Sequence, residues 1–327
     1  MIGYYVHHHG AGHVTRACQI ALHLQTPVTG FSSLPRPAAW PGEWVELPSD
    51  VTASAIDPTA GGVLHWAPLS HVGYAHRMET LSAHMGSLDV LVVDVSVEVS
   101  LLARLHGVPT VVVAMRGDRS DTPHRLAYDS ATSLLVPWAA EFPEPWWPKA
   151  WRDKSHFVGA ISRFDHQRPS VRPPTGNRRR VLVLLGAGGH DVTEDALVAA
   201  ARQTPGWHWT LRSPQSPSPD VWQDLLLADV VVTHGGNNAV AEVAAARRPA
   251  VVVAQERPFR EQHHMADALE RGGVCIGVQS WPAAERWTDL LEEAIARGAS
   301  RWSLWNPLDG AQRAARHLDA FAGKEAA

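Results

Sequence analysis

The stretch that most constrains the fold of this chain runs from residue 228 to residue 247. Residues 228–232 are mostly apolar and β-branched, which is typical of a buried strand in a parallel sheet. Residues 239–247 are rich in alanine and contain neither proline nor glycine, which favours a helix. Gly235 and Gly236 lie between them. This order of strand, glycine turn and helix predicts a phosphate site, because the first N–H groups of a helix have no partner inside it.

Polar side chains extend this expected site. His234 stands at the end of the strand, where its ring could donate to a phosphate oxygen. Glu242 lies about one turn inside the helix, where its carboxylate could reach a ribose diol beside that phosphate. A plain strand–turn–helix packing of the two glycines is the alternative. We expect a nucleotide diphosphate to be bound by His234, Gly235, Gly236, Asn237, Asn238 and Glu242.

The same residues carry a resemblance to known enzymes. His234, Gly236, Asn238 and Glu242 fall in the register of the His-x-Gly-x-Asn-Ser-x-x-Glu signature of secondary-metabolite UDP-glycosyltransferases. Ala239 replaces the usual Ser or Thr, so one hydroxyl contact with the phosphate is missing. Residues 225–242 also resemble the family of enzymes that add N-acetylglucosamine to the peptidoglycan lipid precursor. The resemblance implies the GT-B fold, an α/β architecture of two facing Rossmann-like domains, each with a parallel sheet and helices on both faces.

The resemblance also implies a division of labour between domains. Residues 1–162 are expected to bind the acceptor and residues 163–310 the nucleotide-sugar donor. Residues 311–327 are expected to form a helix that packs back toward the first domain. The segment from 163 to 180 is rich in proline and arginine, which is typical of a linker. Alternating strand and helix patterns in the first half favour a parallel sheet.

Composition excludes several classes of protein. The formal net charge of −4 gives no support for nucleic-acid binding. Cys18 and Cys275 are far apart, so neither a disulfide framework nor a zinc pattern is expected. No apolar run approaches the roughly 20 residues of a membrane span, and the first residues lack a signal-peptide pattern. We expect a cytoplasmic protein, with peripheral contact with the inner face of the membrane left open.

His13 and Asp94, both in the first half, form the expected catalytic pair. Gly12 and His13 follow the first expected strand and precede a helix expected over residues 14–24. The resemblance implies that Gly12 contacts the donor and that His13 is the general base. Imidazole suits that role because it titrates near neutral pH. Asp94 closes a strand over residues 89–94, and the resemblance implies that it orients His13. Helix capping is the plainer alternative for both residues.

Two further segments are expected at the donor. The turn after residues 181–185 contains Gly186, Gly188 and Gly189, which the resemblance places against the diphosphate. Glu261 and Gln262 are expected to hold hydroxyl groups of the donor sugar. A second alignment, on residues 267–269, chooses His263 and His264 instead. No metal is expected, because the three histidines at residues 7–9 have no evident carboxylate or cysteine partner.

Two segments of the first half keep several interpretations open. Residues 115–126 are polar and follow a strand, so they should face the cleft, either touching the acceptor or as a solvated charge run. Residues 138–151 hold several tryptophans, for which an acceptor wall, a membrane or partner contact, and a filled space between the domains all remain open.

The expected reaction is transfer of a sugar from a nucleotide-diphosphate sugar, with a UDP-sugar favoured, to a hydroxyl group of the acceptor. The transfer should be inverting and should need no cofactor, the nucleotide-sugar being a co-substrate. The acceptor is a small molecule, a lipid-linked molecule or a polymer precursor. Residues 255–258 resemble the Thr-Glu-Arg-Pro motif of sugar-nucleotide 2-epimerases, which keeps that activity as an alternative. A noncatalytic sugar-nucleotide-binding accessory protein is a third.

Overall fold

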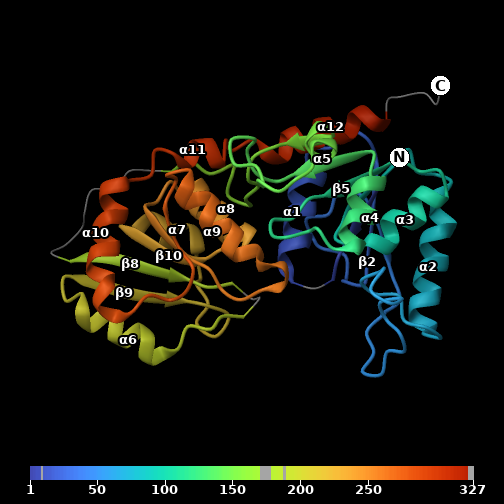
Figure 1. Ribbon diagram of the computed structural model, residues 1–327. Helices are drawn as coiled ribbons and strands as arrows, with labels where there is room; N and C mark the ends of the chain where they lie inside the picture. Colours follow the sequence, from blue (N-terminus) through green and yellow to red (C-terminus); the bar gives the residue numbers. More distant parts are fainter. Residues whose placement is uncertain (9, 170–177, 187–188, 323–327) are drawn as a thin grey trace.

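The computed structural model describes residues 1–8, 10–169, 178–186 and 189–322 (Figure 1). Two groups of alternating strands and helices lie side by side, each built on its own parallel sheet. Gly188, one of the residues expected at the diphosphate, lies outside the described residues. Among the described residues, no helix combines the length and the apolar character needed to cross a membrane.

The first sheet is parallel throughout its described strands, in the order β3-β2-β1-β4-β5-β6-β7. Its central strands are runs rich in valine and leucine because helices cover both faces of the sheet and bury these strands. The strands are β1 (Ile2–Val6), β2 (Val28–Ser32), β3 (Glu43–Glu46), β4 (Val90–Asp94), β5 (Thr110–Val113), β6 (Ser133–Val136) and β7 (Ser155–Phe157). The helices between them are α1 (Ala11–Ala21), α2 (Val72–Met85), α3 (Val97–Leu105), α4 (Thr122–Ser130) and α5 (Lys149–Asp153).

The second sheet is also parallel, in the order β12-β11-β10-β8-β9. Its strands are β8 (Arg179–Leu184), β9 (Trp207–Arg212), β10 (Val230–His234), β11 (Ala250–Val253) and β12 (Ile276–Val278). Its helices are α6 (Glu194–Gln203), α7 (Val221–Leu227), α8 (Asn237–Ala246), η1 (Pro258–Arg260), α9 (Glu261–Arg271), η2 (Ala284–Arg286) and α10 (Trp287–Arg297). The first sheet ends at Phe157 and the second begins at Arg179, on either side of the boundary expected at residue 162.

The strand orders determine where a ligand can bind. In each sheet the chain winds outward in both directions from its first strand, so the order reverses between β1 and β4 and between β8 and β10. In open α/β sheets, a crevice forms outside the carboxyl ends of the strands at such a reversal. The expected catalytic pair lies in the helix that follows β1 and at the end of β4, and the expected phosphate site lies in the turns after β8 and β10. The topology therefore places both expected sites at crevices.

The end of the chain returns to the first domain. After α11 (Trp302–Trp305), helix α12 (Gly310–Ala322) lies along the first domain beside α1 (Figure 1). Its small residues and Leu318 are buried in one apolar cluster with β1, β4 and α1. The chain thus links the two domains twice.

Several expectations from the sequence were wrong in detail. Helix α1 begins at Ala11 rather than at residue 14, so His13 lies in its first turn. Residues 115–126 are not a solvated run, because Arg116 and Arg119 are buried and α4 begins at Thr122. The tryptophans of residues 138–151 are mainly core residues: Trp147 and Trp151 pack edge to face on Tyr128 and on each other, and Trp138 packs on Trp147 at a tilt. Of these, Trp138, Trp147 and Trp151 are buried.

Candidate active site

A cleft of about 500 Å³ lies between the two domains and gathers most of the expected site residues. The first domain contributes the loop after β1 and the first turn of α1. The second contributes the ends of β8 and β10, the start of α8 and the start of α9. The expected residues that line the cleft are Gly12, His13, Gly186, Gly189, His234, Gly236, Asn237, Asn238, Glu242, Glu261 and Gln262.

His13 and Asp94 form a hydrogen-bonded pair. The distance from His13 Nδ1 to Asp94 Oδ1 is 2.8 Å, and the carboxylate is fully buried behind the ring. The pair forms because Asp94 is the direct neighbour of Val6 in the sheet, and the short loop after Val6 leads into the first turn of α1, which carries His13. Ser96, and not Asp94, caps α3, since its Oγ accepts the N–H of Val99. The capping alternative for Asp94 is therefore wrong.

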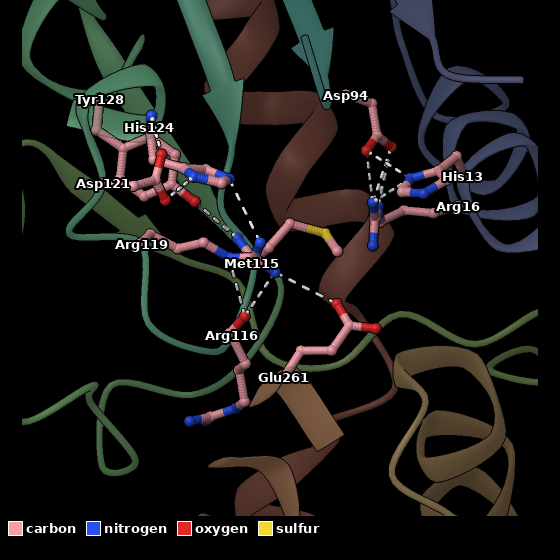
Figure 2. Close-up of polar contacts among 10 residues, drawn as sticks. All are labelled: His13, Arg16, Asp94, Met115, Arg116, Arg119, Asp121, His124, Tyr128 and Glu261. Carbon is pink, nitrogen blue, oxygen red and sulfur yellow. Dashed lines mark hydrogen bonds and ion pairs between the residues drawn. The ribbon is translucent and has the colours of Figure 1, made fainter. Parts of the chain in front are cut away.

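Arg16 is a third member of this group that the sequence did not suggest. Its Nη2 donates to Asp94 Oδ1 at 2.6 Å and to Oδ2 at 2.9 Å, and it is 5% exposed. Figure 2 shows the guanidinium beside the imidazole, both aimed at the carboxylate. The sequence did not suggest this contact because the helix was expected to begin only at residue 14, after His13. Once α1 begins at Ala11, residues 13 and 16 share one face of the helix.

The charge state of Asp94 follows from these contacts. Burial acts to raise the pKa of the carboxyl, but the charges and hydrogen bonds of Arg16 and His13 outweigh it and lower the pKa from 3.8 to about 2. Asp94 is therefore an anion at neutral pH. Because His13 Nδ1 faces this anion, Nδ1 carries the proton and Nε2 is left as an acceptor.

On the opposite wall, His234 differs from its expected role as a phosphate donor. The N–H of Gly186 points at its Nε2 at 2.9 Å, and the N–H of Gly236 points at its Nδ1 at 3.0 Å. Burial, then the charges of Arg257 and His190, lower its pKa to about 4, so the ring is neutral and can accept at one nitrogen only. Gly236 is required here because a Cβ would lie 2.6 Å from the imidazole. The His234 ring thus lies in front of the backbone N–H groups of Gly186 and Gly236.

Helix α8 brings two further expected residues to the cleft. Asn238 Nδ2 reaches the carbonyl of Gly12 at 3.4 Å and so links the second domain to the first. Glu242 Oε1 pairs with Arg163 Nε at 2.8 Å, an ion pair that the sequence did not suggest. Burial raises the pKa of Glu242, while Arg163 opposes this rise. The carboxylate thus faces the cleft with a cation from the interdomain segment beside it.

The structure separates the two alignments at α9. Glu261 and Gln262 line the cleft, whereas His263 and His264 are not among its described lining residues. The latter two pair with Glu256 and Glu144, respectively. Gln262 is buried, and its Oε1 accepts the N–H groups of Gly235 and Gln255, both at 3.2 Å. The amide oxygen of Gln262 therefore holds the turn after β10. Glu261 is the residue of this pair whose carboxylate lines the cleft.

A second cavity, of about 320 Å³, lies inside the first domain. Aromatic and aliphatic side chains such as Tyr5, Tyr74 and Trp66 line it together with polar and charged ones, among them Glu98 and the ion pair of Arg77 with Asp50. The His7 ring lines this cavity and packs edge to face on His13, with 5.8 Å between the ring centres. The cavity therefore adjoins the His13–Asp94 pair.

One group of described residues has the composition of a metal site. Ligand atoms of His65, Asp121 and His124 lie within 4.8 Å of one another. These side chains already bond each other, with His124 Nδ1 2.6 Å from Asp121 Oδ2. His124 Nε2 also lies 3.3 Å from Nη1 of Arg119. The guanidinium therefore occupies the position in front of this nitrogen that a metal ion would need. None of the three is among the described residues lining the interdomain cleft.

Comparison with known proteins agrees with this architecture. Residues 218–301 match the glycosyltransferase family 28 C-terminal domain. A relative from Klebsiella pneumoniae strain 342 is 27% identical over 150 residues. It is the UDP-N-acetylglucosamine–N-acetylmuramyl-(pentapeptide) pyrophosphoryl-undecaprenol N-acetylglucosamine transferase. The alignment covers 45% of this chain but only 37% of the relative's length.

Two solved structures match nearly the whole chain. The glycotransferase of kitacinnamycin has a TM-score of 0.63 at 18% identity, covering 97% of this chain and 95% of the other. MurG from Acinetobacter baumannii has a TM-score of 0.60 at 15% identity, covering 99% of both chains. The chain has the GT-B fold. The expected fold class and the resemblance stated from the sequence are thereby confirmed. In this GT-B chain, the family 28 match contains the turn at residues 234–236, Glu242 and Glu261.

Proposed function

We propose that this GT-B protein is an inverting glycosyltransferase that moves a sugar from a UDP-sugar to a hydroxyl group of an acceptor. The observation that carries the proposal is the His13–Asp94 pair, which shares the cleft with the N-terminus of α8. A base on one wall and an anion site on the other are the two groups that such a transfer requires. The uridine nucleotide is favoured because the curated relative uses UDP-N-acetylglucosamine.

The first-domain wall supplies the base. The acceptor O–H would give its proton to His13 Nε2 while the acceptor oxygen bonds to the anomeric carbon of the sugar. The carbon–oxygen bond to the diphosphate breaks in the same step. Asp94, held as an anion by Arg16, holds Nδ1–H and stabilises the imidazolium that forms.

The second-domain wall supplies the electrostatics. The leaving diphosphate gains negative charge as the bond breaks, and the start of α8, where the first N–H groups lack partners inside the helix, lines the cleft. Glu242 would accept hydrogen bonds from the ribose hydroxyls. No metal is part of the proposal, since helix dipole and N–H groups are the stabilising groups it invokes.

Among the acceptor classes, we favour a small hydroxylated molecule with an apolar body. The cavity beside His13 has aromatic and aliphatic walls, and its volume of about 320 Å³ suits a small ring system. A lipid-linked acceptor or polymer precursor would have to present its hydroxyl to His13 from outside this cavity.

The test is a turnover assay with UDP-sugars in the presence and absence of hydroxylated aromatic acceptors. We expect UDP release that depends on the acceptor, with the glycosylated product detected by mass spectrometry. A changed sugar-nucleotide without any acceptor would identify an epimerase and contradict the proposal. Binding of the UDP-sugar without turnover across a broad acceptor panel would favour an accessory protein.

A further inference from the structure

The two domains meet at a second contact beside the cleft. The loop after β5 lies against the turn before α9, and the N–H of Asp118 donates to the carbonyl of Phe259 at 2.9 Å. Gly117 makes this approach possible, because its φ is +98° and a Cβ would lie 2.4 Å from the Phe259 carbonyl oxygen. The backbones of the two domains are thus in direct contact one residue before Arg260.

The Phe259 side chain packs on the first domain. Its ring lies 4.4 Å from the Arg119 guanidinium carbon and packs edge to face on His124 at 4.6 Å between centres. Phe259 and Arg260 are both left-handed, with φ of 60° and 53°. Two consecutive non-glycine residues rarely adopt this conformation, which persists only where its surroundings enforce it. Contacts from the first domain therefore hold this turn of the second.

Arg119 is fixed by its own domain and reaches into the other. It is 3% exposed, its Nε and Nη2 donate to the carbonyl of Arg116, and its Nη1 lies 3.3 Å from His124 Nε2. Its Nη2 also donates to Glu261 Oε2 at 3.3 Å. In Figure 2 the Glu261 side chain lies between Arg119 and the His13–Arg16 group. A rigid cation of the first domain thus sets the position of a cleft carboxylate of the second.

We propose that Arg119 is a positioning residue that holds Glu261 for the donor sugar, and that Phe259 makes this hold depend on docking of the two domains. The proposal rests on the proposed function, because it takes the cleft as the nucleotide-sugar site. The Glu261 carboxylate has four lone-pair directions, and the single bond from Arg119 leaves others free for sugar hydroxyls. The sugar is therefore recognised fully only when the domains are docked, whereas the nucleotide is held mainly by residues of the second domain.

Calorimetry on the full chain separates these two parts of the ligand. UDP is the probe without a sugar, and UDP-N-acetylglucosamine and UDP-glucose are the probes with one. We expect Arg119→Met to weaken binding of the preferred UDP-sugar roughly tenfold while leaving UDP affinity unchanged, because the loss concerns hydrogen bonds to a charged group. Arg119→Lys should restore part of the loss. Arg125→Met, at an exposed arginine of α4, is the matched control and should change neither affinity.

Phe259→Ala provides a second variant that should fold, since Phe259 is 37% exposed. It should show the same selective loss, although the Arg119 side chain is intact. The losses from Arg119→Met and Glu261→Gln should not add in the double variant, because both remove one shared contact. Additive losses, or equal losses for UDP and the UDP-sugar, would overturn the role of Arg119.

The outcomes also separate this inference from the proposed function. If the parent binds neither UDP-sugar nor UDP, the donor-site assignment fails and the inference fails with it. If the parent prefers a UDP-sugar to UDP and Arg119→Met keeps that preference, only the inference fails. A variant that loses UDP and UDP-sugar binding together with its folded circular-dichroism spectrum is replaced by the milder Arg119→Lys, which must then show a selective loss of its own.

Discussion

Asp94 is the residue that connects the base to the fold. It is fully buried, it ends a central strand, and it holds both His13 and Arg16. We predict that His13→Ala lowers turnover by on the order of 100-fold or more, the usual contribution of a positioned base, with donor affinity nearly unchanged. Asp94→Asn should lower turnover less. The two losses should not add in the double variant, because the residues act as one unit.

Steady-state kinetics of the single and double variants check this prediction, with calorimetric donor affinity measured alongside. His106→Ala, at an exposed histidine, is the control for loss of a ring. Parent-level turnover in His13→Ala would show that His13 only begins a helix, and the base would then be sought elsewhere.

Glu242 gives a second prediction at this scale. Removing its carboxylate takes a charged hydrogen-bond acceptor from the expected ribose site, so Glu242→Ala should weaken UDP binding about tenfold or more. Glu292→Ala is the matched control. Glu292 lies in the same domain and pairs with Arg179 on the surface, just as Glu242 pairs with Arg163 at the cleft. Calorimetry measures both affinities. Equal affinity in Glu242→Ala and the parent would refute the ribose assignment.

At the scale of elements, the turn between β10 and α8 predicts a pH dependence of stability. The pKa of His234 is about 4 in the folded protein and near 6.5 in the unfolded chain, so between these pH values the unfolded chain binds more protons. The stability from the neutral ring is therefore complete above pH 6.5 and is lost as the pH falls toward 4. The difference is at most about 3 kcal/mol.

Urea unfolding from pH 4 to pH 8 measures this effect. His234→Gln keeps an acceptor for a backbone N–H but does not titrate, so its free energy of unfolding should fall less than that of the parent between pH 6.5 and pH 4. His106→Gln should behave as the parent does. The idea is wrong if His234→Gln and the parent lose stability in parallel.

The same turn predicts a ligand effect. His234 lies in front of two backbone N–H groups that a phosphate could use. His234→Ala should therefore alter the affinity for UDP much more than the affinity for uridine, which lacks phosphate. Calorimetry with both ligands checks this, and equal changes for the two would show that His234 has only a structural role.

For the whole molecule, α12 makes the first domain depend on the end of the chain. Leu318 is fully buried against the first domain, so Leu318→Ala should lower the free energy of unfolding by about 3 kcal/mol through lost burial and a cavity. Leu304→Ala, at a leucine that is 43% exposed, should change it by less than about 0.5 kcal/mol. Urea titrations followed by tryptophan fluorescence measure both, and similar losses would mean that α12 does not stabilise the fold.

The sequence alone determined the elements and the class of the fold. Runs of valine with glycine turns specify buried parallel strands followed by helices, because local propensity and hydrophobic pattern act over a few residues. The turn at residues 234–236 and the helix near the end of the chain followed from such local patterns, whereas the pairing of His13 with Asp94 was expected only from the family resemblance. The sequence predicts the start of α1 three residues too late because Gly10-Ala11-Gly12 resembles a loop, while the structure starts the helix at Ala11.

Only the tertiary structure decided which charged side chains meet. Arg16 with Asp94, Arg163 with Glu242 and Arg119 with Glu261 join residues 78, 79 and 142 positions apart in the chain. Sheet order and domain docking determine such contacts, and a charged residue carries no local sign of its distant partner. The same holds for His234, whose pattern suggested a donor to phosphate. Burial keeps its ring neutral, and backbone N–H groups from two separate strand ends point at its two nitrogens, one of which can accept.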